Sequence, residues 1–156
     1  MATTPEWCAS LSEWKQHFQK WVHSAQPKAL LHSTIFFDLR ALYGQTELVR
    51  ALYEKLFKEI EGAPNFFFFM TQNALRTKPP IGFLGTFVVE SSGENKHKFN
   101  LKERALRPLV DCARILSLAA RSMETSTVKR FTVAKEHGLL RNMLIENAIE
   151  AVSYTH

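Results

Sequence analysis

The two aspartates of the chain bear most directly on its chemistry. Asp38 and Asp111 are the only aspartates among 156 residues, and neither has an acidic residue two positions away. Metal-dependent phosphoryl transfer needs acidic ligands gathered around paired cations. Two isolated aspartates do not provide such a clamp. We therefore expect no metal site and no complete catalytic centre in this chain.

Other catalytic motifs are also missing from the sequence. It contains no HExxH, no GxSxG, no GxxxxGK and no GxGxxG pattern. No two histidines have the close helical spacing that metal sites favour, and Cys8 and Cys112 lie far apart. We expect each histidine to be a surface or internally satisfied residue. The histidines are His17, His23, His32, His97, His137 and His156.

Charged residues inside apolar stretches are the candidates for a binding site. Asp111 and Arg114 are three residues apart, so they share one face of a helix and can pair. Asp38 interrupts an apolar run that we interpret as helix. Arg40, two positions later, lies on a different face from Asp38. Further candidates with polar or cationic side chains are Lys102, Thr127 and Arg130.

Two interpretations of these residues stay open. In the first, they form a buried ion-pair network that holds helices in register, because a buried charge without a partner is costly. In the second, they line a polar cleft that receives an anionic ligand, since guanidinium and ammonium groups bind phosphate and carboxylate. The contacts to that ligand would be Arg40, Lys102, Arg114 and Arg130.

Capping residues and apolar periodicity predict helices along most of the chain. The first begins at Ser10, which has capping-box spacing with Glu13. The second begins at Pro27 and runs to Gly44. The remaining helices are expected over 46–61, 64–75, 108–121, 126–137 and 141–156.

A change of pattern near residue 78 predicts the one departure from helix. Pro79, Pro80 and Gly82 break the helix, and FLGTFVVES has the β-branched and aromatic content of a strand. SGEN would turn the chain, and KHKFNLK would return as a second strand. We therefore expect a mainly α fold, a bundle of six to seven helices with one small β-hairpin at about residues 81–102.

Composition places the chain among ordinary globular proteins. It is 46% hydrophobic and 22% charged, a length and balance that fit a single domain spanning 1–156. Two unpaired cysteines indicate a reducing, cytoplasmic setting, and no apolar run is long enough to span a membrane. The net charge of +5 is compatible with an anionic partner, but no basic stripe with interleaved aromatics suggests nucleic acid. The last helix has no stop signal, so we expect a fragment of a longer protein.

Four stretches of sequence carry a family resemblance. IFFDLRALYG, PPIGFLGTFV, NLKERALRPLVDCARILSL and STVKRFTVAKEHGLL occur in this order. Together they resemble the putative nucleotidyltransferase substrate-binding domain over about residues 14–151, with Phe131 standing where that family usually has Leu. The family pattern falls on Asp38, Arg40, Gly44, Pro80, Gly82, Lys102, Pro108, Asp111, Arg114, Thr127, Arg130 and Gly138.

The resemblance implies a division of labour. Such domains usually end bacterial signalling proteins, after a cyclic-nucleotide-binding or CBS-pair region and a catalytic domain related to protein-PII uridylyltransferase. That catalytic domain would bring Mg²⁺ and the nucleoside triphosphate, and this chain would bind no cofactor itself. Its partners would be the catalytic domain, and a nucleotide or a PII-like acceptor. The alternative is a regulatory or interaction module that docks against sensor domains or self-associates, with purely structural charged residues.

Overall fold

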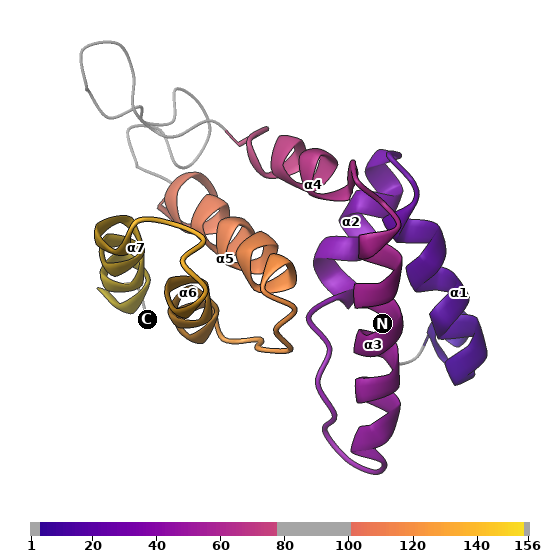
Figure 1. Cartoon of the computed structure of the whole chain (residues 1–156). Coiled ribbons are helices and arrows are strands. Elements are labelled where there is room, and N and C mark those ends of the chain that lie inside the picture. The colour runs from indigo at the N-terminus through magenta and orange to yellow at the C-terminus, as the bar shows by residue number, and fades with distance from the viewer. Residues whose placement is uncertain (1–3, 78–100, 155–156) are drawn as a thin grey trace, which may run out of the picture. The chain divides into compact units, whose positions relative to one another are not determined.

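The structure is a computed structural model that describes residues 4–77 and 101–154. Two compact units divide the chain, unit 1 over residues 1–70 and unit 2 over residues 71–156. Figure 1 shows the course of the chain through its helices. Among the described residues, none of the helices has the length and apolar character needed to cross a membrane.

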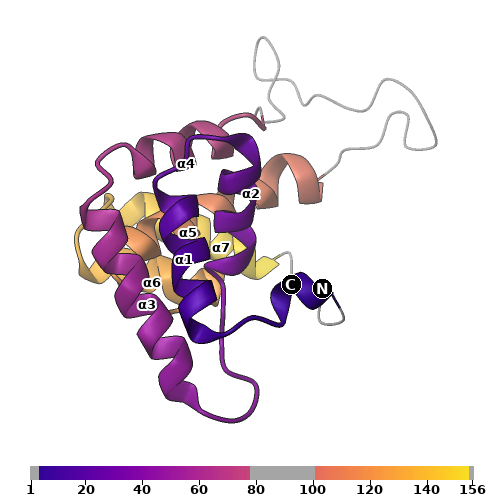
Figure 2. The same cartoon turned by 90° about the vertical axis from the view of Figure 1, so that its right-hand side faces the viewer.

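Unit 1 is built on three helices that follow a short 3-10 turn, η1 (Pro5–Trp7). They are α1 (Leu11–Val22), α2 (Pro27–Phe36) and α3 (Thr46–Glu61), and α1 packs against both of the others. Figure 2 shows α1 and α3 side by side. Helix α4 (Phe66–Ala74) begins in this unit. The core is strongly aromatic, with Phe18 in T-shaped contact with Phe37 at 4.9 Å between ring centroids.

Local sequence signals give α1 and α3 the ends that we predicted. Ser10 caps α1: its hydroxyl accepts from the Glu13 amide, and the Glu13 carboxylate accepts from the Ser10 amide at 2.7 Å. This reciprocal capping box satisfies amides that the first helical turn leaves without partners. Helix α3 ends at Glu61, as expected, and Gly62 is its C-cap.

The second helix is shorter than we predicted. It starts at Pro27 as expected but ends at Phe36, so Asp38 lies in a turn and Arg40 in irregular chain. The hydroxyl of Tyr53, from α3, is hydrogen-bonded to the main-chain oxygens of Phe37 at 3.1 Å and Leu39 at 3.2 Å. This tertiary contact occupies carbonyls that a continuing helix would use for its own ladder. The helical-face argument for Asp38 and Arg40 therefore does not apply.

Unit 2 is formed by α5 (Arg107–Ala119), α6 (Thr127–Glu136) and α7 (Asn142–Tyr154), with a short π-helix, η3 (Lys102–Leu106), leading into α5. In this unit α6 packs against both α5 and α7. The apolar centre is small and close-packed. Its buried members are Ala113, Phe131, Ala134, Ile145 and Val152.

The predicted β-hairpin at about 81–102 requires correction. Leu101 is helical and Lys102 begins η3, so the end of the supposed second strand is helix. Residues 81–100 lie outside the described residues, and the described ranges contain helices but no strand. The sequence of η3 is KERAL, and all five of these residue types are strong helix formers. Glu103 also pairs with Arg107 four residues later at 3.1 Å, which supports the helical turn. The mainly α prediction is confirmed.

Candidate functional site

The pair predicted from i,i+3 spacing forms on α5. Arg114 donates from Nη1 to Oδ1 of Asp111 at 2.6 Å. The Arg114 side chain is 9% exposed and that of Asp111 17%, so water screens this pair weakly. A short charge-assisted hydrogen bond in such a place holds the guanidinium in one orientation.

Arg130 is the second buried cation of unit 2. It lies in α6 with 2% of its surface exposed, and its Nε donates to the carbonyl oxygen of Glu124 at 2.6 Å. Glu124 belongs to the connection between α5 and α6. Arg130 therefore ties that connection to the body of α6.

The connection between α5 and α6 holds polar residues that we did not predict as part of a site. Ser117 is buried, and its hydroxyl donates to the main-chain carbonyl oxygen of Ser122. The side-chain hydroxyl of Ser122 in turn accepts a hydrogen bond from the Glu124 amide at 3.2 Å. Arg121 has a φ of +54°, a left-handed conformation that L residues seldom adopt. The polar run SMETST between two helices is the sequence signal that marks this connection.

The remaining predicted residues fall into two groups. Lys102 is exposed in η3, and Thr127 is half-buried as the first residue of α6. Asp38, half-buried, and Arg40, exposed, belong to unit 1, whereas the other candidates belong to unit 2. Within the predicted set, the structure pairs Asp111 with Arg114.

Cys112 and the acidic groups bear on catalysis. Burial raises the pKa of the Cys112 thiol, which disfavours the thiolate that a nucleophile requires. The Cys112 side chain packs against the apolar centre of unit 2, as a structural residue would. Across residues 4–77 and 101–154, no three His, Cys, Asp or Glu side chains are grouped so that they could hold a metal ion.

A separate polar cluster joins α1 to α3 in unit 1. His23 Nε2 lies 2.8 Å from Oε2 of Glu59, and Lys55 pairs with the other carboxylate oxygen. The hydrogen bond from Lys55, followed by the one from His23, holds the pKa of Glu59 below its usual value. The three groups link the end of α1 to the last turns of α3, which indicates a structural role.

The net charge of the chain is carried by one of its halves. Residues 1–70 have seven Lys or Arg and seven Asp or Glu, whereas residues 71–156 have thirteen and eight. The net charge of +5 therefore belongs entirely to residues 71–156. Such an excess attracts anions over distances of about a Debye length, ~8 Å at physiological salt.

Comparison with known families gives two matches. The family described as "putative nucleotidyltransferase substrate binding domain" matches residues 64–156, and the family described as "putative nucleotidyltransferase" matches residues 1–28. These matches confirm the resemblance inferred from the motifs. No curated protein and no solved structure gives a significant match. The first range contains Lys102, Asp111, Arg114, Thr127 and Arg130, whereas Asp38 and Arg40 lie in neither.

Proposed function

Because the chain belongs to the family of putative nucleotidyltransferase substrate binding domains, we propose that residues 71–156 hold an anionic substrate for a separate catalytic domain. The substrate is the nucleotide or a PII-like acceptor protein, and the catalytic domain is of the protein-PII uridylyltransferase type. The observation that carries the proposal is the location of the whole net charge of +5 in the segment that the family match covers.

The side chains in that segment suit phosphate or carboxylate groups. Arg114 is held by Asp111 and Arg130 by Glu124, and fixed guanidinium groups bind oxyanions with little loss of side-chain entropy. Lys102 adds an exposed ammonium group on η3. Thr127 adds a hydroxyl at the start of α6, where the helix dipole also favours an anion. These groups bind and orient a substrate, and they transfer nothing.

The catalytic domain supplies Mg²⁺ and the nucleoside triphosphate under this proposal, in a cytoplasmic bacterial signalling protein. The chain alone is then inactive. Incubation of the chain with nucleoside triphosphate, Mg²⁺ and a PII-type acceptor should give no labelled acceptor. Turnover above that of a heat-denatured sample would contradict this division of labour.

Binding of nucleotide by the chain tests the proposal directly. Calorimetric titration with a nucleoside triphosphate should show saturable binding, weakened several-fold by Lys102→Ala. Lys102 is exposed, so the variant should keep its fold, and Lys58→Ala on the exposed face of α3 is the matched control. If Lys102→Ala and Lys58→Ala bind equally well, or the wild type binds neither nucleotide nor acceptor, the proposal fails.

A second candidate function is an interaction module, and exposed apolar side chains on α7 favour it. Met143 is 63% exposed and Leu144 49%, and the hydrogen bonds from Arg114 to Asp111 and from Arg130 to the Glu124 main-chain oxygen fit a structural role without any ligand. Sedimentation over a range of concentrations distinguishes the two. Self-association that Met143→Glu abolishes would support the interaction module. The module is excluded if the chain is monomeric at every concentration and also does not bind the sensor domains of the full-length protein.

A further inference from the structure

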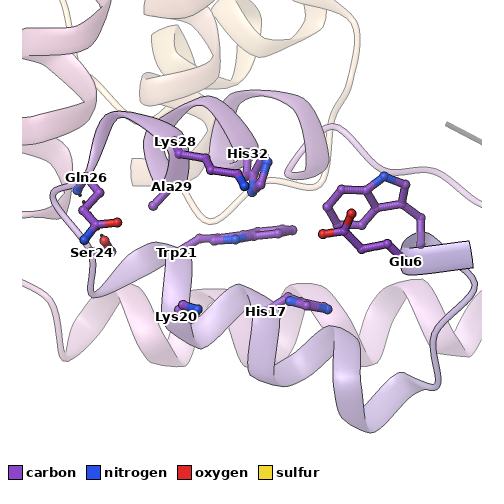
Figure 3. Close-up of a pocket in the computed structure, with 10 residues that line it drawn as sticks. Glu6, His17, Lys20, Trp21, Ser24, Gln26, Lys28, Ala29 and His32 are labelled. Atoms are coloured by element: carbon purple, nitrogen blue, oxygen red, sulfur yellow. Dashed lines mark hydrogen bonds between the residues drawn. The ribbon is translucent and has the colours of Figure 1, made fainter. Parts of the chain in front are cut away.

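We propose that a pocket in unit 1, formed by η1, α1 and α2, binds the phosphate group of a small ligand. The pocket lies outside the residues predicted as a site and is independent of the proposed function of unit 2. It has a volume of about 190 Å³. Pockets for drug-sized molecules measure roughly 300–1,000 Å³, so this pocket suits one functional group. Figure 3 shows its lining, which includes Glu6, His17, Lys20, Trp21, Lys28 and His32.

The charge of the lining is positive. Lys20 from α1 and Lys28 from α2 both line the pocket, and neither forms an ion pair with any residue that the structure describes. Glu6 from η1 is the one carboxylate among the lining residues. Two ammonium groups without carboxylate partners attract an anion, and Figure 3 shows Lys28 extending from α2 alongside His32, on the side of α2 that faces Trp21.

Trp21 supplies a hydrogen-bond donor to the same pocket. It is buried, yet its indole N–H has no hydrogen bond to the described residues. No buried side-chain nitrogen or oxygen in the described part of the chain lacks a partner. The indole nitrogen therefore has exposed surface, and Trp21 is one of the residues that line the pocket. An oxyanion would accept from it, because indole is a donor only.

Neighbouring rings hold Trp21 in place. His17 stacks with it at 5.5 Å between centroids, Phe36 stacks at 5.1 Å, and His32 meets it edge-on at 5.0 Å. Since stacked neighbours already engage the ring, the indole offers the pocket its N–H edge. The pocket is thus suited to an acceptor-rich group such as phosphate and less suited to another stacked ring.

His32 makes this binding pH-dependent. Burial, followed by the nearby Lys28, lowers the pKa of His32, which favours the neutral imidazole. As pH falls through that lowered pKa, His32 gains a positive charge and the pocket attracts an anion more strongly. The other titratable groups that face the pocket are Glu6 from η1, His17 and Lys20 from α1, and Lys28 from α2. A bound phosphate would in turn raise the pKa of His32.

Intrinsic fluorescence gives a selective test, because Trp7 and Trp21 line the pocket and Trp14, the remaining tryptophan, contacts both of them. Inorganic phosphate is titrated into the full chain at constant ionic strength, with sodium chloride as the ionic control. We expect a saturable change, with at least tenfold weaker binding in the double variant Lys20→Ala/Lys28→Ala. Both lysines are exposed, so the fold should persist, and Lys58→Ala should bind as the wild type does.

A second titration with a nucleoside monophosphate distinguishes free phosphate from the phosphate end of a larger ligand. Tighter binding of the monophosphate, lost in the double variant, assigns the larger ligand, and equal binding assigns phosphate itself. The absence of a saturable signal with either probe overturns the proposal, as does a signal that the double variant retains. Lys102→Ala should leave the signal unchanged, so failure of this pocket and failure of the unit 2 site are separable.

Discussion

Replacing Arg114, which forms a buried ion pair, should destabilise the protein far more than replacing Arg107, an arginine of the same helix whose ion pair is exposed. Arg114→Ala leaves the carboxylate of Asp111, whose side chain is 17% exposed, without its partner. Breaking a buried pair costs about 3–5 kcal/mol. Because Asp111 keeps some contact with water, we expect a loss at the lower end, about 3 kcal/mol.

Arg107→Ala is the matched control. Arg107 also lies in α5 and pairs with Glu103, but the two side chains are 57% and 55% exposed. Exposed pairs contribute about 0–1 kcal/mol, so this variant should lose less than about 1 kcal/mol. Urea unfolding followed by far-UV circular dichroism measures both losses. Tryptophan fluorescence, which arises wholly from residues in unit 1, checks that the variants keep that unit folded.

A double variant separates charge from packing. Asp111→Leu/Arg114→Met removes both charges and keeps similar volume, so it should recover most of the stability lost in Arg114→Ala. The reasoning is refuted if Arg114→Ala and Arg107→Ala lose the same amount of stability. If instead the double variant is as unstable as Arg114→Ala, the loss comes from packing of the arginine stem and not from the unpaired carboxylate.

Three further predictions concern unit 1. Tyr53→Phe should lower the free energy of unfolding by about 1–3 kcal/mol, because it removes the hydroxyl proton shared between the main-chain oxygens of Phe37 and Leu39, while Tyr43→Phe at a fully exposed position should change nothing. Equal effects in urea melts would contradict this account. Because the pKa of Glu59 is lowered in the folded protein, its ionised carboxylate stabilises the fold at pH values above its unfolded pKa, near 4.5. That contribution to the free energy of unfolding is lost as pH falls through the lowered folded pKa. Wild-type stability should therefore fall more steeply below pH 4.5 than that of Glu59→Gln, and parallel curves would exclude a contribution from the pair with Lys55. Ser10→Ala should cost about 1 kcal/mol through loss of the capping box, and an unchanged unfolding midpoint would show that the cap contributes nothing.

The sequence alone determined the features that depend on near neighbours. The capping box at Ser10, the ends of α3 and the pairing of Asp111 with Arg114 each involve residues three or four positions apart or a single capping residue. Within a helix such residues are in contact whatever the rest of the chain does, so spacing predicts them. The family resemblance also rests on local motifs and needed no structure.

Only the tertiary structure decided the features that join distant segments. Helix α2 ends at Phe36, and just past that end the hydroxyl of Tyr53, sixteen residues after Phe37, is hydrogen-bonded to the main-chain oxygens of Phe37 and Leu39. Nothing in the local run IFFDLRALY indicates that end. The pocket at Trp21 likewise needs η1, α1 and α2 together, so histidines that the sequence presents as isolated become its walls. Pairwise spacing records contacts within one helix, whereas packing between helices decides which polar groups share a pocket and which carbonyls lose their helical partners.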